Sequence, residues 1–109
     1  MQFLLIGYDG SDVEASERRK KARPAHLLLA QELKLQGKLL YATALTSEEP
    51  GQEDVLVGSV MVYDFPTRQD LDLMLTGEPY LLQKVWQKTE VRKCKAPPLF
   101  QAHFQAALK

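Results

Sequence analysis

Residues 55–65 read Val-Leu-Val-Gly-Ser-Val-Met-Val-Tyr-Asp-Phe, and this stretch carries the strongest indication of the fold. It has the length and composition of a β-strand, and residues 60–63 are apolar without a break. A strand that shows one face to water alternates apolar and polar side chains instead. We therefore expect this strand to bury both of its faces.

Apolar runs and turn residues divide the rest of the chain into strands and helices. The predicted strands span residues 2–8, 38–45, 55–65 and 86–95. The predicted helices span residues 12–21, 24–36 and 67–76, with a helical turn at 80–85. Gly37 and Gly77 mark helix ends, because glycine favours the left-handed conformation that closes a helix. Residues 86–95 interleave lysine and arginine, which is typical of an edge strand protected by charge.

Two helices are expected between the first two strands. Ser11 and Glu14 fit a capping box at the start of the first helix. Pro24 cannot continue that helix without a break, so we expect it in the first turn of the next one. A core-facing stripe of that second helix comprises His26, Leu29, Ala30 and Leu33. His26 is then expected in a first turn, where the helix dipole favours a neutral imidazole.

The order β-α-β-β-α-β predicts an α+β fold of the ferredoxin-like type, a four-stranded antiparallel sheet with two helices on one face. Residues 2–8 and 55–65 are apolar on both faces, whereas the helices cover only one. The uncovered face needs a partner, and a second copy of the sheet can supply it. We therefore predict a homodimer, or a higher assembly, in which sheets pack face to face.

Length and composition exclude several classes of protein. The 109 residues suit a single domain, and 14 Lys and Arg balance 14 Asp and Glu, which argues against a general nucleic-acid binder. The one cysteine, Cys94, cannot form an intrachain disulfide. No apolar run approaches the roughly 20 residues that span a bilayer, and the N-terminus lacks the basic stretch of a signal peptide. We expect a cytoplasmic protein with neither a nucleic-acid nor a membrane partner.

Three titratable residues are candidates for acid–base chemistry. His26 can act as a general base or acid because an imidazole titrates near neutrality, or it can be a core or capping histidine. Asp9 and Glu78 occupy loops attached to rigid elements, and either can orient the imidazole. Asp9 before Gly10 is also a common turn signal.

Residues 18–23 form a basic run that contains one further candidate. Glu14 and Glu17 precede the run at helical spacing, so ion pairing on a solvated helix face explains most of it. Arg23 differs from the others, because it adjoins Pro24 at the expected helix start and can aim its guanidinium at a carboxylate.

Metal and thiol chemistry are not expected. His26 and His103 are the only histidines, and neither has neighbouring ligands at metal-binding spacing. Cys94 lies in a charged edge strand without a histidine partner in its motif. No glycine-rich loop for a phosphate or dinucleotide is present, so no cofactor is predicted.

In combination, four short motifs resemble the YCII-related proteins over residues 3–93. These motifs are Tyr8-Asp9-Gly10, Arg23-Pro24-Ala25-His26-Leu27, Gly58-Ser59 and Glu78-Pro79-Tyr80. The resemblance implies a ferredoxin-like fold that dimerises into an α/β-barrel with a small pocket holding a histidine and an acidic residue. His26 and Asp9 carry over as catalytic residues. Glu78 stands where the family usually has aspartate, which lengthens the carboxylate side chain.

The resemblance also bears on function. Arg23, Ser59 and Tyr80 are expected to bind a ligand in this pocket. One resembling class of protein removes chloride from a chlorinated hydroxyquinol. We therefore predict a cofactor-independent acid–base enzyme, of a lyase, dehydrochlorinase or isomerase type, that acts on a small cyclic or aromatic metabolite. A non-catalytic dimeric ligand-binding module, or an accessory protein with a vestigial pocket, is the alternative.

The sequence predicts two regions. Residues 1–96 form the ferredoxin-like domain, and residues 97–109 form a C-terminal extension. Phe100, Phe104 and Leu108 recur every four residues, so the extension is expected to form an amphipathic helix.

Overall fold

The structure of the protein is a computed structural model that describes residues 1–100. The strands are β1 (Gln2–Asp9), β2 (Leu39–Thr46), β3 (Leu56–Asp64) and β4 (Trp86–Cys94). The helices are α1 (Ala15–Leu35), α2 (Arg68–Leu75) and α3 (Pro79–Leu82), followed by a 3-10 turn, Pro98–Phe100. The strands form one antiparallel sheet in the order β2-β3-β1-β4. This confirms the predicted ferredoxin-like fold.

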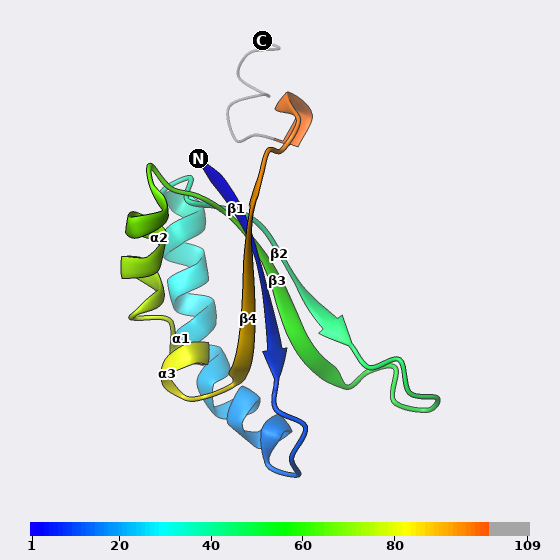
Figure 1. Ribbon diagram of the computed structural model, residues 1–109. Coiled ribbons are helices and arrows are strands. Elements are labelled where there is room, and N and C mark those ends of the chain that lie inside the picture. Colours follow the sequence, from blue (N-terminus) through cyan, green and yellow to red (C-terminus); the bar gives the residue numbers. More distant parts are fainter. Residues whose placement is uncertain (101–109) are drawn as a thin grey trace.

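The helices lie together on one face of the sheet (Figure 1). Between the helices and the sheet lies the core, to which the inward side chains of β1 and β3 contribute most. Phe3 and Leu5 of β1 pair with Tyr63 and Met61 of β3, and all four are almost fully buried. Leu71 of α2 packs against this cluster. Because side chains alternate along a strand, the intervening residues of β1 and β3 project from the opposite face.

α1 is one continuous helix, so the prediction of two helices separated at Pro24 is wrong. Pro24 lies inside the helix on its exposed side, where water can solvate the carbonyl that lacks an N–H partner. The buried residues of α1 are Arg19, Ala22, His26 and Leu33. This stripe contacts the core on both sides of Pro24, and its burial offsets the local cost of about 3 kcal/mol for an interior proline.

His26 consequently lies in the middle of α1 rather than in a first turn, and the prediction of a helix-dipole effect on its imidazole is wrong.

The predicted capping box at the start of α1 is also wrong. Glu14 is the N-cap residue but its side chain makes no capping hydrogen bond, and the Glu14 amide instead donates to Asp12 Oδ2 at 3.3 Å. Asp12 is already held by Arg18, so Asp12 rather than Ser11 satisfies the amide.

The C-terminus of α1 follows the sequence prediction. Gly37 adopts a positive φ of 73°. Its amide donates to the carbonyl of Lys34 at 3.0 Å, and the Lys38 amide donates to that of Leu33 at 2.8 Å. These two bonds close the helix in the manner that favours glycine at this position.

Within residues 1–100, no helix lies on the other face of the sheet. Leu4 and Ile6 of β1 pair with Val62 and Val60 of β3, and all four remain partly exposed. Tyr41 of β2, which pairs with Val62, is 62% exposed on the same face. The structure therefore leaves an apolar surface where the sequence predicted a second sheet.

β4 is an edge strand, as its charged residues predicted. Beyond it, the chain leads through Ala96 to the turn at Pro98–Phe100, which lies at the end of the sheet away from α3 (Figure 1). The predicted helix through Phe104 and Leu108 lies outside the described residues. Within residues 1–100, no helix is long and apolar enough to cross a membrane.

Candidate active site

A histidine and a glutamate from distant parts of the chain form a buried pair. His26 projects from the middle of α1, and Glu78 immediately precedes α3. Their exposed fractions are only 6% and 1%, and His26 Nδ1 lies 2.5 Å from Glu78 Oε1. The same Oε1 accepts the amide of Tyr80 at 3.1 Å, so Glu78 also caps α3. The backbone of α3 thus fixes the carboxylate that holds the imidazole.

Two aromatic rings fix the orientation of the imidazole. Tyr80 stacks on His26 with ring centroids 3.7 Å apart and an interplanar angle of 4°. Trp86 meets His26 edge-on at 5.8 Å and 79°. A carboxylate can only accept hydrogen bonds, so Nδ1 is the donor in the contact with Glu78. Nε2, which has no hydrogen-bond partner among residues 1–100, is left as the nitrogen that can exchange a proton.

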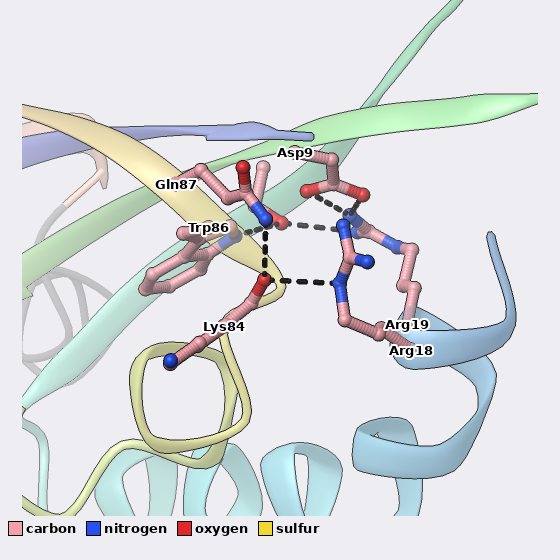
Figure 2. A network of polar contacts seen from close by, with 7 residues as sticks. Asp9, Arg18, Arg19, Lys84, Trp86 and Gln87 are labelled. Atoms are coloured by element: carbon pink, nitrogen blue, oxygen red, sulfur yellow. Dashed lines mark hydrogen bonds and ion pairs between the residues drawn. The ribbon is translucent and has the colours of Figure 1, made fainter. Parts of the chain in front are cut away.

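A second polar cluster lies at the end of β1. Arg19 Nη1 donates to both carboxylate oxygens of Asp9, at 3.0 and 2.8 Å, and Arg19 Nη2 donates to Ser59 Oγ at 3.0 Å. Figure 2 shows Arg19 reaching Asp9 from α1, with Arg18 beside it and Trp86 opposite. The Trp86 indole Nε1 donates to the same Ser59 oxygen at 3.1 Å. These contacts join α1, β1, β3 and β4 in one network.

Gly7 makes room for Trp86 in this network. A Cβ atom added at Gly7 would lie 2.5 Å from atoms of the indole ring, so only glycine allows the ring to lie over β1. β1 and β3 pair Gly7 with Ser59, which places the Ser59 hydroxyl beside the indole. The close approach of ring and backbone thereby supports the hydrogen bond between Trp86 and Ser59.

Burial controls the electrostatics of the site. Burial raises the pKa of Asp9 above its ordinary value, although the hydrogen bond and positive charge of Arg19 partly oppose it. Burial likewise raises the pKa of the Tyr80 phenol, against the charges of Arg19 and Arg23. The Arg19 guanidinium carbon also lies 5.0 Å from the centroid of the Tyr80 ring, a cation–π contact that connects the two clusters.

A cavity of about 200 Å³ opens beside both clusters, between α1 and strands β2 and β3. It is lined by Arg19, Arg23, His26, Leu27, Ala42, Thr43, Ala44, Leu56, Ser59, Met61 and Tyr80. Asp9 and Glu78 are not among the lining residues, and they lie behind it as partners of Arg19 and His26. The lining thus combines an imidazole, the hydroxyl-bearing side chains of Thr43 and Ser59, a phenol ring and two guanidinium groups around a space of small-molecule size.

The structure brings five of the six predicted site residues together in two clusters at one end of the sheet, and the sixth, Arg23, lines the cavity beside them. His26, Glu78 and Tyr80 are in mutual contact. Ser59 and Asp9 share Arg19 as a partner, and Asp9 does not contact the imidazole. Arg23 is exposed at the cavity, and the structure shows it paired with no carboxylate among residues 1–100.

The sequence reasoning did not identify Arg19 and Trp86. The sequence predicts that Arg19 belongs to a solvated basic run, but Arg19 is buried because it lies on the stripe that includes Ala22 and His26. Extending the His26 stripe backwards at helical spacing would have found it. The predicted ion pairing of the basic run with Glu14 and Glu17 holds only for Lys20, whose Nζ lies 3.6 Å from Glu17 Oε1.

Within the described part of the chain, no group of three or more histidine, cysteine, aspartate or glutamate side chains has the geometry of a metal site. Cys94 lies on β4 at a distance from the site along the strand, and burial raises the pKa of its thiol. His103 lies outside the described residues.

Comparison with solved structures supports the fold. The 5-chloro-2-hydroxyhydroquinone dehydrochlorinase TftG from Burkholderia phenoliruptrix AC1100, solved in complex with 2,5-dihydroxybenzoquinone, superposes with a TM-score of 0.76 and 18% identity, covering 89% of this chain and 96% of that one. An antibiotic biosynthesis monooxygenase superposes with a TM-score of 0.51 and 14% identity, covering 89% and 98% of the two chains.

Comparison with curated sequences gives the family. The chain is 28% identical over 96 residues to the YciI proteins of Escherichia coli O6:H1 and Shigella flexneri, a match that covers 85% of this chain and 97% of each relative. The model of the YCII-related domain matches residues 1–95. Because this family model covers nearly all of the described residues, the chain belongs to the YCII-related family.

Proposed function

We propose that this protein is a cofactor-independent acid–base enzyme that acts on a small cyclic or aromatic molecule in the cavity beside His26. The observation that carries the proposal is the contact of His26 Nδ1 with Glu78 at 2.5 Å, beside a cavity that His26 itself lines. Glu78 and the stacked Tyr80 hold the imidazole in one orientation. Nε2 can then take a proton from a substrate hydroxyl or acidic C–H group and return it later.

The carboxylate has a defined part in this chemistry. When Nε2 takes a proton the ring becomes an imidazolium, and the nearby Glu78 carboxylate stabilises that positive charge. The longer glutamate side chain reaches both the imidazole and the Tyr80 amide. We therefore propose that Glu78 can fill the role that the family usually gives to aspartate. Asp9 would act through Arg19, by holding that guanidinium at the cavity wall.

The structural relative TftG supports the choice of substrate class. It is a dehydrochlorinase and was solved with 2,5-dihydroxybenzoquinone, a small cyclic molecule with hydroxyl and carbonyl groups. A cavity of about 200 Å³ suits a single ring of this kind. We carry over only this class of molecule, because 18% identity relates the folds and not the reactions.

Deuterium exchange tests the acid–base role. The protein is incubated in D₂O with 2,5-dihydroxybenzoquinone, and exchange at the ring C–H positions is followed by NMR. In parallel, chloride release from 5-chloro-2-hydroxyhydroquinone is measured. We expect catalysis of one of these reactions, and we expect His26→Asn to lower the rate about 10²- to 10⁴-fold. Glu78→Gln should lower it less, because the amide still occupies the position next to the imidazole.

Leu28→Ala is the matched control. Leu28 lies on α1 two residues after His26, is 62% exposed and does not line the cavity, so its rate should match that of the wild type. An unchanged rate in His26→Asn would refute the acid–base role. Binding of the quinone without any exchange or chloride release would favour the alternative, a non-catalytic ligand-binding module.

We also propose that the protein is a homodimer whose sheets pack face to face. The support is the apolar open face, where Leu4, Ile6, Val60 and Val62 remain partly exposed. Light scattering at micromolar concentration should give twice the mass of one chain. Val62→Lys should shift that mass towards one chain, because it places a charge in the middle of the interface. A wild-type mass equal to one chain would refute this proposal.

A further inference from the structure

Both lone pairs of the Ser59 hydroxyl oxygen accept hydrogen bonds from other side chains of the protein. A serine oxygen has two lone pairs and one hydrogen. Arg19 Nη2 donates to Ser59 Oγ at 3.0 Å, and Trp86 Nε1 donates to it at 3.1 Å. Neither contact uses the hydroxyl hydrogen, and within residues 1–100 the structure shows no acceptor for it. Ser59 can therefore take part in further hydrogen bonding only as a donor.

Ser59 lies at the cavity, where its hydroxyl hydrogen can be donated to a ligand. Ser59 is only 2% exposed, yet it lines the cavity beside His26. Arg19 lines the same cavity, and its Nε is buried with no hydrogen-bond partner. Arg23 brings a second guanidinium to the lining. The side chains that line the cavity around Ser59 thus include two guanidinium groups, and no carboxylate is among the lining residues.

Trp86 sets the direction of the Ser59 hydroxyl without lining the cavity. An indole nitrogen can only donate, so Trp86 always occupies an acceptor position on Ser59. The ring is 3% exposed and lies over Gly7, and it meets Tyr80 edge-on at 5.5 Å. The indole can hardly rotate away in this packing, so the Ser59 hydrogen has little choice of direction.

We propose that Trp86 is a positioning residue that makes Ser59 a hydrogen-bond donor, and that the cavity therefore selects small molecules with an anionic acceptor oxygen, such as a carboxylate, enolate or phenolate. The inference rests on the proposed function in using the same cavity. In that reaction, one substrate oxygen would accept from Ser59 while another group gives its proton to His26. A ligand that offers an N–H or O–H donor to Ser59 finds no free lone pair there.

Two probes of the same shape test this selectivity. Benzoate has only acceptor oxygens and a negative charge, whereas benzamide replaces one oxygen with an NH₂ donor. Isothermal titration calorimetry gives the dissociation constant of each. We expect the wild type to bind benzoate at least about tenfold more tightly than benzamide, and Ser59→Ala to weaken benzoate binding about tenfold, as for a lost hydrogen bond to a charged group.

Trp86→Phe isolates the positioning role, because it removes the indole N–H and keeps an aromatic ring. It frees one lone pair of Ser59, so the preference for benzoate should fall at least about threefold. In the Ser59→Ala background the same substitution should leave the preference unchanged. Gln87→Ala is the control, because Gln87 is exposed on β4 next to Trp86 and does not line the cavity.

Several results would overturn the inference. One is a wild-type protein that does not bind benzoate or does not prefer it to benzamide. Another is a double variant in which the effects of Trp86→Phe and Ser59→Ala on the preference for benzoate are additive. The chain has one tryptophan, so the single indole N–H resonance should move in Ser59→Ala if the hydrogen bond exists. Should Trp86→Phe fail to fold, Ser59→Ala decides alone, and a benzoate affinity within twofold of the wild type refutes the inference.

The two proposals fail separately. The calorimetry involves no proton transfer, so a protein that prefers benzoate but neither exchanges deuterium nor releases chloride refutes only the proposed enzyme function. A protein that catalyses one of those reactions but shows no preference refutes only the role of Trp86 and Ser59.

Discussion

Replacing Gly7 with alanine should destabilise the protein through a single contact. The added Cβ would lie 2.5 and 2.6 Å from three atoms of the Trp86 indole, far inside ordinary carbon–carbon contact distance. The indole is 3% exposed and packed against Tyr80, so it cannot move without disturbing its neighbours. Overpacking of this kind costs about 1–3 kcal/mol. The displaced indole would also lose its hydrogen bond to Ser59, which adds about 1 kcal/mol.

The expected decrease in the free energy of unfolding is thus about 2–4 kcal/mol. Urea denaturation followed by the fluorescence of Trp86, the only tryptophan, measures it. Gly77→Ala is the matched control, because its Cβ would meet only the carbonyl of Met74 at 3.7 Å, an ordinary contact. A Gly7→Ala protein as stable as Gly77→Ala would show that β1 and the indole do not pack as described.

Three further predictions concern the ion pairs at the same end of the sheet. Arg19→Lys should lower the free energy of unfolding by about 1–3 kcal/mol in urea, because one ammonium cannot replace the guanidinium that spans Asp9 and Ser59; an unchanged midpoint would contradict this. The Asp9 carboxyl should titrate above 3.8 by NMR, because burial outweighs Arg19, and a value below 3.8 would count against its burial. Its raised pKa favours the folded state most below pH 3.8, and this contribution is lost as the pH rises through the folded-state value. Asp12 should behave in the opposite way: Arg18 lowers its pKa to about 2, so its stabilisation is complete above pH 3.8 and disappears as the pH falls through about 2. Asp12→Asn should remove this pH dependence of the stability. Acid unfolding curves identical to those of the wild type would exclude a stabilising role for the ionised Asp12 carboxylate.

The sequence alone was enough to predict the four strands, their order and most of the helical segments, although it divided α1 in two. The pattern of residues 55–65 predicts a strand, and β3 spans Leu56–Asp64. The pattern of residues 67–76 predicts a helix, and α2 spans Arg68–Leu75, where the Thr67 side chain accepts a hydrogen bond from the Asp70 amide at the start of the helix. Apolar periodicity, capping residues and glycines act over a few positions along the chain, so these features can be seen without a tertiary structure.

The partners of the site residues depended on contacts between distant segments. Either Asp9 or Glu78 could have held His26, and only the packing of α3 against α1 places Glu78 on the imidazole. Arg19 carries the same charge as its neighbours in residues 18–23, yet the sheet beneath α1 buries it. A charged side chain is buried only where a partner such as Asp9 is supplied, and that partner comes from another element.

Pro24 shows the difference between local sequence preference and tertiary packing within one helix. Its local chemistry predicts a break, because the ring removes an N–H and crowds the preceding turn. The structure nevertheless continues α1 through it, because Arg19 and Ala22 before the proline and His26 and Leu33 after it are all buried. The sequence determined which segments form strands and helices, because those preferences are local. The tertiary structure alone decided that α1 is continuous and that Glu78 and Arg19 meet their partners, because the energy of burial depends on what lies opposite.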